Sequence, residues 1–453
     1  MNQSGTKNMT EGKPLPLIVS FALPLMVGNI FQQMYTVVDT MVVGKTLHVS
    51  ALAALGAADW LNWLMLGVVT GLPQGFAILM AQQFGAKEYD ALRKTVGCSV
   101  LLSVMSAVFL AIVGQSVILP VLQLLKTPEE ILPGSVLYLR IMFAGIPIVL
   151  AYNLLASILR SLGDSKTPLY AMIVASITNI VLDLLFVPVL GWGIAGAAIA
   201  TVIAQGVSGF YCLLRLRTIS ILKMDRSCFR PDTVLFARLI KLGMPIAVQN
   251  AIIAIGGMLI QSVVNGFGVI FIAGYTAANK MYGILEMAAV SFGAAMMTYV
   301  GQNLGAGKLD RIRQGVRAGT IVCVAISCVI CAVMLLLGRF ILSGFISGDP
   351  DTAAQALDIA YEYLTVMSLC LPVLYILYVV RAAILGVGNT LLSLISGFAE
   401  LAMRTAGVLL LPAVLGYSGI FYAEVSAWLG ADLILIPGYF LLMRRLYNGH
   451  HDR

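Results

Sequence analysis

Two aspartates stand inside long apolar stretches and are the side chains best placed to do chemistry. Asp39 follows Tyr35 by four positions and Asp183 follows Asn179 by four, so each pair shares one face of a helix. A charged group within an apolar span costs about 2.5–3.5 kcal/mol, which means that each aspartate needs a partner or a function. The simpler alternatives are a solvated carboxylate for Asp39 and a hydrogen bond between helices for Asp183, but together the pairs favour a polar site.

Position along the spans brings further polar groups to a similar depth. Counting about 1.5 Å per residue places four of them in the outer halves of their spans: Asp39, Asp183, Tyr138 and Thr201, with Asn153 deeper. Such oxygens suit either a sodium ion or a proton, because two carboxylates that share a low-dielectric site let one of them bind a proton near neutral pH. The expected sodium ligands are Asp39, Asn179, Asp183 and Thr201.

The long apolar runs in which these residues lie make up most of the sequence. Of 453 residues, 60% are hydrophobic and 11% are charged, whereas a soluble domain carries roughly 25% charged residues. Runs long enough to span a bilayer as helices follow one another along the chain. They lie at about 15–41, 52–80, 95–120, 134–159, 167–190, 194–216, 239–265, 270–300, 316–342, 358–385, 390–414 and 419–443. We therefore expect an all-α integral membrane protein of twelve transmembrane helices.

The basic residues indicate orientation rather than nucleic-acid binding. With the N-terminus inside, most Lys and Arg residues fall in internal loops, which matches the positive-inside rule. An even number of spans then leaves both termini in the cytoplasm. The sequence predicts a multi-pass protein of the plasma (inner) membrane with the lipid bilayer as its solvent, no nucleic-acid partner and no obligate protein partner.

The two halves of the sequence repeat one another. The segment from Gln82 to Arg93 matches that from Gln302 to Arg313, and Pro24 recurs as Pro245. Since six spans separate the copies, both halves enter the membrane with the same polarity, as in parallel-repeat transporters. We expect two pseudo-symmetric six-helix lobes. The predicted segments are a cytoplasmic N-terminus 1–14, an N-lobe 15–217, a cytoplasmic linker 218–237, a C-lobe 238–443 and a cytoplasmic tail 444–453.

The second half carries ionisable groups of its own within the spans. Glu400 and Arg404 are four apart, so the simplest expectation is an ion pair along one helix. Glu286 has no such neighbour and is expected to face a cavity, where it could attract a cationic substrate. Met287 beside it is a candidate for an adaptable binding wall, with packing or lipid contact as the alternative.

Enzyme chemistry is not expected of this sequence. No histidine falls in a predicted span, and neither a paired catalytic motif nor a phosphate-binding GxxxxGK[ST] loop is present. We therefore predict a secondary transporter that is not an enzyme and uses no cofactor other than its coupling ion, H+ or Na+.

The chain resembles the multidrug and toxic compound extrusion (MATE) family over essentially its whole length. The resemblance lies in the order and spacing of short motifs: Phe21–Pro24, Val38-Asp39-Thr40, Ala81–Ala86, Leu159–Asp164, Asn179 with Asp183, and Gly301–Ala306. It implies a V-shaped pair of lobes that exports amphipathic, often cationic small molecules in exchange for sodium or protons. Bacterial origin also follows from the resemblance.

The resemblance also implies roles for individual residues. The cation would bind at Asp39 and Asp183, with Asn179 and Thr201. A surrounding polar network would include Tyr35, Tyr138 and Asn153. The first helix would bend near Pro24 when its aspartate is protonated, although a static kink is the alternative. Some members carry an acidic site in the seventh span, but Val248–Gly256 here has no carboxylate, which favours coupling through the first half.

A flippase for a lipid-linked saccharide is the main alternative function. Its cavity would be expected to carry several basic side chains for a pyrophosphate. Only four basic residues lie within or at the ends of spans, namely Arg140, Lys280, Arg381 and Arg404. The sequence names neither the substrate nor the coupling ion.

Overall fold

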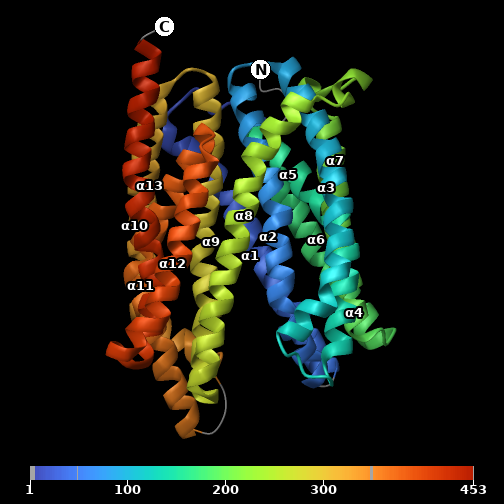
Figure 1. The fold of residues 1–453 in the computed structure, drawn as a ribbon, viewed down its shortest axis with the longest axis vertical. Helices are drawn as coiled ribbons and strands as arrows, with labels where there is room; N and C mark the ends of the chain where they lie inside the picture. The colour runs from blue at the N-terminus through green and yellow to red at the C-terminus, as the bar shows by residue number, and fades with distance from the viewer. Residues whose placement is uncertain (1–5, 48, 347–349, 452–453) are drawn as a thin grey trace. The chain divides into compact units, whose positions relative to one another are not determined.

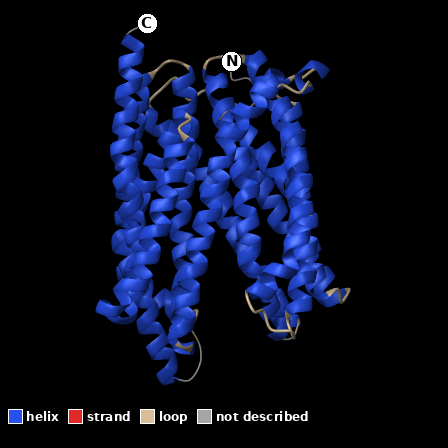
Figure 2. Ribbon diagram, viewed as in Figure 1, coloured by secondary structure: helices blue, strands red, loops and turns tan. Residues whose placement is uncertain are grey.

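The computed structural model describes residues 6–47, 49–346 and 350–451, and all regular structure in these residues is helical (Figures 1 and 2). The outermost residues of the predicted cytoplasmic segments 1–14 and 444–453 lie outside the described ranges. The expectation of an all-α protein is therefore confirmed.

The first half of the chain forms seven α-helices with short 3₁₀ and π segments between them. They are α1 (Pro14–Thr46), α2 (Val49–Gly85), α3 (Tyr89–Leu124), α4 (Leu132–Ala144), α5 (Ile146–Ser161), α6 (Lys166–Leu184) and α7 (Gly193–Arg217). A π-helix, η1 (Leu185–Val189), extends α6, and two 3₁₀ turns, η2 (Ser220–Leu222) and η3 (Arg226–Phe229), follow α7. Helix α2 packs on α3 and α5, and α7 packs on α5 and α6.

The second half forms longer helices. They are α8 (Thr233–Val264), α9 (Val269–Gly305), α10 (Leu309–Ser343), α11 (Pro350–Val387), α12 (Thr390–Leu415) and α13 (Gly419–His451), with 3₁₀ turns η4 (Asn265–Phe267) and η5 (Gly416–Ser418). Helix α10 packs on α11, and α13 packs on both α11 and α12.

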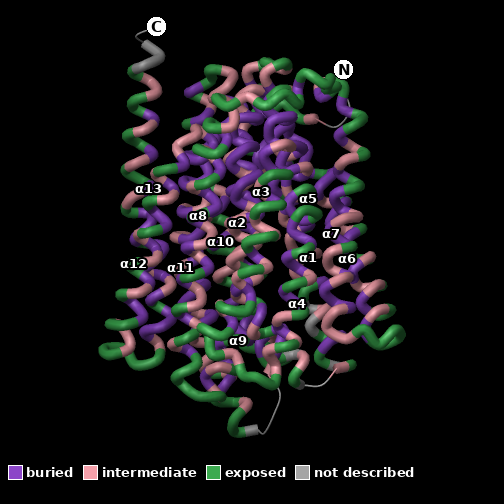
Figure 3. Tube along the Cα trace, turned by 45° about the vertical axis from the view of Figure 1, so that its right-hand side comes forward, coloured by how far each residue is buried: buried purple, intermediate pink, exposed green. Residues whose placement is uncertain are grey.

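The helices are long and apolar enough to cross a bilayer. Ten candidate spans are found in the described residues, or eleven if the bent pair α4 and α5 is one span. The last candidate, Thr390–Asn448, covers both α12 and α13 with the turn η5 between them, so the helices account for the twelve expected spans. Large apolar side chains such as Phe109, Ile112 and Phe210 are exposed, so lipid can solvate them. Figure 3 shows exposed stretches in green along the helices.

The fourth span is not the single straight helix that the run 134–159 predicts. It is broken at Gly145 into α4 and α5, which are bent by 47°. Pro147, the second residue of α5, has no N–H to donate to the preceding turn. A Cβ on Gly145 would lie 2.6 Å from Val202 of α7, so glycine allows α7 to pack against the bend.

The chain forms two compact units whose boundaries fall inside helices. The first unit is mainly Leu23–Ala251, and it also includes the segment that ends at Glu11 and the residues Gly305–Gly307. The second unit is made of Gly12–Ala22, Ile252–Leu304 and the chain from Lys308 onward. Helices α1 and α8 therefore each contribute to both units. In α1 the change falls between Ala22 and Leu23, directly before Pro24.

A row of glycines on α2 allows close backbone packing in the first unit. Gly71 and Gly75 lie one turn apart on α2. A Cβ on Gly71 would lie 2.6 Å from the backbone of Ala247 in α8, and a Cβ on Gly75 would lie 2.3 Å from the backbone of Gly243. Gly67, a further turn along, accepts a 3.0 Å hydrogen bond at its carbonyl from the Asn250 side chain. Small residues at this spacing are a common means of close helix packing in membranes.

Candidate cation site

Four helices of the first unit carry the polar residues predicted to bind the cation. Tyr35 and Asp39 lie on α1, Asn179 and Asp183 on α6, and Thr201 on α7, while Tyr138 lies on α4. The i, i+4 spacing on α1 and α6 holds within continuous helix, so each pair shares a face.

The side chains from these helices come together. The Asn179 amide nitrogen lies 3.5 Å from the Thr201 hydroxyl, whose own proton goes to the Ala197 carbonyl at 3.1 Å. The carboxylates of Asp39 and Asp183 are close enough for their charges to interact. The structure thus places the predicted residues of α1, α6 and α7 around one region.

Several buried oxygens of this region have no hydrogen-bond donor. Asp183 and Asn179 are fully buried, and neither the two Asp183 carboxylate oxygens nor Asn179 Oδ1 has a hydrogen-bond partner among the described residues. The same holds for Asp39 Oδ1. Leaving a buried polar atom unpartnered costs about 1–3 kcal/mol, and more when the atom is charged. The arrangement therefore lacks positive charge or donors that a bound cation would supply.

Helix α6 does not continue as a regular α-helix beyond Leu184. Directly after Asp183 and Leu184 the helix widens into the π-turn η1, which contains Pro188. Proline has no N–H, so Pro188 donates no hydrogen bond to the carbonyls one turn before it. π-Turns of this kind are frequent at functional sites.

The donor set fits a proton or a sodium ion. The unpartnered side-chain atoms of this region are all oxygens, which suit hard cations. Two of the side chains, Asp39 and Asp183, are carboxylates that can each take a proton. In the described part of the chain no three His, Cys, Asp or Glu side chains come together as a transition-metal site would require. The residues that would hold sodium are Asp39, Asn179, Asp183 and Thr201.

The outer members of the predicted network differ in their contacts. Tyr138 is buried within electrostatic reach of Tyr35, Asp39 and Asp183. Asn153 on α5 donates a 2.8 Å hydrogen bond to the Val149 carbonyl of its own helix.

Pro24 lies inside α1, which runs through it without a break in the helix. The bend that the resemblance implies at this proline stays a prediction.

Gln205 belongs to the site but is absent from the sequence prediction. It lies one turn after Thr201 on α7, is 9% exposed, and its amide nitrogen is 3.4 Å from the Tyr35 hydroxyl. Its side-chain oxygen is a further buried acceptor without a partner in the described structure. A polar residue four positions after Thr201 in an apolar span is the signal that could have identified it.

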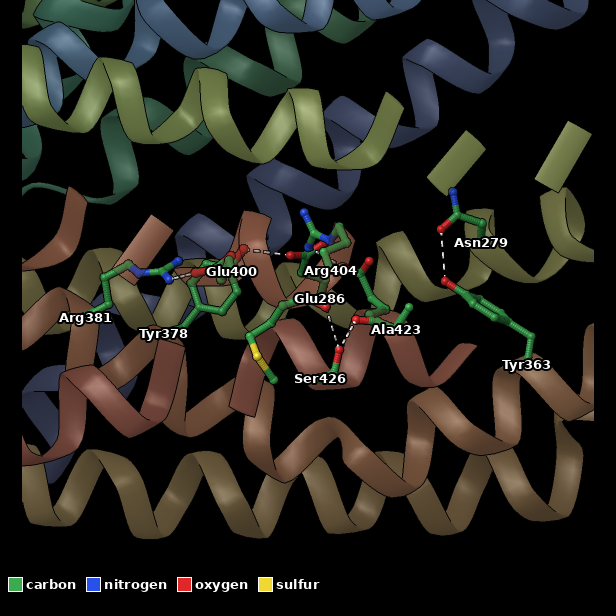
Figure 4. A network of polar contacts seen from close by, with 11 residues as sticks. Asn279, Glu286, Tyr363, Tyr378, Arg381, Glu400, Arg404, Ala423 and Ser426 are labelled. Carbon is green, nitrogen blue, oxygen red and sulfur yellow. Dashed lines mark hydrogen bonds and ion pairs between the residues drawn. The ribbon is translucent and has the colours of Figure 1, made fainter. Parts of the chain in front are cut away.

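The candidate substrate residues of the second unit lie on α9. Glu286 is half-buried and accepts a 2.6 Å hydrogen bond from the Tyr378 hydroxyl of α11 (Figure 4). Met287 is also half-buried. Their contact with a substrate stays a prediction.

The expected ion pair between Glu400 and Arg404 is wrong. Glu400 pairs with Arg381 of α11 (Figure 4), and Arg404 pairs with Glu424 of α13 at 2.7 Å. Helices α11 and α13 pack close to α12, so each charged side chain of α12 pairs with a residue of another helix and not with its neighbour one turn along α12.

Comparison with known proteins identifies the family. The MatE family profile matches residues 24–185 and again residues 245–407, beginning at the two prolines that the repeat pairs. The chain is 31% identical over 428 residues to the probable multidrug resistance protein YpnP of Bacillus subtilis, covering 93% of this chain and 91% of that protein. It is 29% identical over 449 residues to the probable multidrug resistance protein YoeA of the same bacterium, covering 93% and 92%.

The fold agrees with solved structures. A MATE protein in complex with MaL6 superposes with a TM-score of 0.89 at 21% identity, covering 97% of this chain and 99% of that one. A MOP superfamily transporter from Pyrococcus furiosus gives 0.90 at 21% identity, covering 98% and 99%. These likenesses confirm the all-α fold of twelve helices in two six-helix lobes. From the two profile matches and the curated relatives, the chain belongs to the MATE family of multi-pass membrane transporters.

Proposed function

We propose that the protein is a cation-coupled antiporter that exports amphipathic, cationic small molecules by alternating access. The observation that carries this proposal is the group of buried oxygens without donors at Asp39, Asn179 and Asp183. Such a group binds a cation in one conformation of the protein. When the cation leaves, the oxygens need other partners, which favours a second conformation. The relatives named multidrug resistance proteins support a drug-like substrate.

The chemistry of the site explains how an ion could drive transport. An empty site leaves Asp39 and Asp183 as two interacting negative charges in a region of low dielectric, which is costly. Binding of a proton or sodium ion removes this repulsion and favours a different packing of α1 against α6. A ligand that binds one state better shifts the equilibrium by its differential affinity, so the ion gradient biases the direction of substrate movement.

Glu286 is the proposed attraction point for the substrate cation, with Met287 as part of the apolar wall. Its carboxylate is held by Tyr378 and has no arginine in direct contact among the described ion pairs. We propose a plasma-membrane location with both termini in the cytoplasm, on the strength of the basic loops and the bacterial relatives. The flippase alternative is not favoured, because the relatives are multidrug resistance proteins.

The test is efflux of ethidium from proteoliposomes under an imposed proton gradient and, separately, a sodium gradient. The proposal expects export under one of the two gradients and none without a gradient, and the effective gradient identifies the ion. Failure of both gradients to move ethidium or another amphipathic cation would contradict the proposal.

A further inference from the structure

The second unit contains a buried charge cluster that the proposed function does not use. Helix α11 contributes Arg381, helix α12 contributes Glu400 and Arg404, and helix α13 contributes Glu424 and Asp432. Arg381, Glu400, Arg404 and Asp432 are each less than 9% exposed. Charges this deep in an apolar helix bundle are rare and mark functional sites.

Together with Glu286 of α9, which the proposed function assigns to the substrate, the cluster divides into two groups of one guanidinium and two carboxylates. Arg381 pairs with Glu400, and its charge also acts on Asp432. Arg404 pairs with Glu424, and both of their charges act on Glu286 (Figure 4 labels Arg404 and Glu286). In each group one carboxylate is left over when the ion pair has formed.

In the group of Arg381, Glu400 and Asp432, here called the inner group, Asp432 is the carboxylate outside the ion pair. Of the two left-over carboxylates, its negative charge has the fewer partners. Its Oδ1 atom is buried and has no hydrogen-bond partner among the described residues. Arg381 does not hydrogen-bond to this atom: its Nη2 contacts Glu400 and, at 3.4 Å, the Ser396 hydroxyl, and its Nε is buried without a partner among the described residues. Glu286, by contrast, accepts a hydrogen bond from Tyr378.

Among the described residues, Arg381 is the one cation whose charge is found to act on Asp432. Of the helices that pack on α13, α11 also carries Tyr378 and α12 carries Glu400 and Arg404, while α13 itself carries Glu424 two turns before Asp432 and Tyr439 two turns after it. Arg404 is committed to Glu424. Ionised Asp432 would thus leave the inner group with a net negative charge in a low-dielectric interior, which is unfavourable.

We propose that Asp432 is a second proton-binding site of the protein, in which one proton neutralises the carboxylate that Arg381 and Glu400 leave uncompensated. The proton converts the bare Oδ1 region into a neutral carboxyl, so the inner group becomes one guanidinium, one carboxylate and one carboxylic acid. A metal ion fits less well, because the guanidinium of Arg381 repels it and the described residues supply no third acidic or histidine ligand. The site does not depend on Asp39 and Asp183.

Infrared difference spectroscopy of the purified protein tests the proposal without substrate or transport. The proton on a buried carboxyl gives a C=O band that disappears when the group ionises, so spectra are taken as the pH is raised from neutral. Because Asp39 and Asp183 can contribute to the same region of the spectrum, the proposal expects one carboxyl component of the band to be lost in Asp432→Asn and restored, at a shifted position, in Asp432→Glu. The matched control Asp358→Asn removes an exposed aspartate paired with Arg339 in the same unit and should leave the band intact.

Isotope labelling and the addition of sodium make the infrared result decisive. If Asp432→Asn does not fold, ¹³C-aspartate labelling of the Asp39→Asn/Asp183→Asn double variant should shift a band assigned to Asp432, since the other buried aspartate among the described residues, Asp164, is bound by Arg215 and Thr167. An unchanged spectrum in folded Asp432→Asn overturns the proposal. So does loss of the band on adding sodium at constant pH to the Asp39→Asn/Asp183→Asn variant, which would assign the Asp432 site to a metal cation. Ethidium efflux is not involved, so failure here leaves the proposed antiport untouched.

Discussion

Single side chains determine what the first unit can bind. Asp183 and Asn179 are buried with their oxygens unpartnered, while Tyr35 and Gln205 extend the polar surface from α1 and α7. The i, i+4 spacing predicts which residues share a helix face. The same spacing could have identified Gln205, four positions after Thr201. It does not predict contacts between helices, and for that reason the pairs Arg381–Glu400 and Arg404–Glu424 could not be found from the sequence.

The role of Gln205 can be tested by Gln205→Leu, which has a similar size but no polar atoms. We expect the coupling-ion concentration for half-maximal transport to rise roughly five-fold, because a lost polar contact of this kind costs about 1 kcal/mol. Transport rates are measured in proteoliposomes across a series of ion concentrations.

The control for Gln205 is Gln261→Leu. Gln261 donates to Asn265 near the end of α8 and belongs to the second unit, whereas the candidate site belongs to the first. Equal ion dependence in Gln205→Leu and Gln261→Leu would show that Gln205 takes no part in ion binding.

At the scale of helices, local breaks position the functional groups. The runs of apolar residues predict the helices well, because length and hydrophobicity are local properties of the sequence. The bend between α4 and α5 and the π-turn η1 depend on Pro147 and Pro188 together with the neighbouring helix α7. Proline marks where a helix can deviate, but tertiary packing decides whether it breaks, and α1 passes through Pro24 unbroken.

The glycine row on α2 gives a prediction about stability. In Gly75→Ala the new Cβ would lie 2.3 Å from the Gly243 Cα of α8, so the two helices must separate. Overpacking of this kind costs about 1–3 kcal/mol. We expect the melting temperature of the purified protein to fall by several degrees in a thermal unfolding assay.

Gly56→Ala is the matched change on the same helix. No atom lies within 4 Å of a Cβ at this position, and alanine favours helix over glycine by about 1 kcal/mol. Its melting temperature should stay the same or rise. A Gly75→Ala protein as stable as Gly56→Ala would show that the close packing of α2 on α8 does not stabilise the fold.

For the molecule as a whole, duplication is the organising feature. The family profile matches the chain twice, and the repeated motifs were visible in the sequence as identical residues at a nearly constant offset. The copies have since diverged in their buried charges. Among the described residues, Asp39 and Asp183 of the first unit form no ion pair, whereas in the second unit Glu400 pairs with Arg381 and Glu424 pairs with Arg404. The fold follows from what the halves share, and the proposed ion sites follow from where they differ.

The measurement that tests the central claim most directly compares the native protein with Asp39→Asn under the gradient that drives ethidium export. Asparagine keeps the shape of the side chain but cannot take up a proton or supply a full negative charge. We predict that gradient-driven export is lost in Asp39→Asn and in Asp183→Asn, while Asp358→Asn exports at the native rate. Gradient-driven export at the native rate by a folded Asp39→Asn protein would contradict the account, since the ion would then be coupled elsewhere.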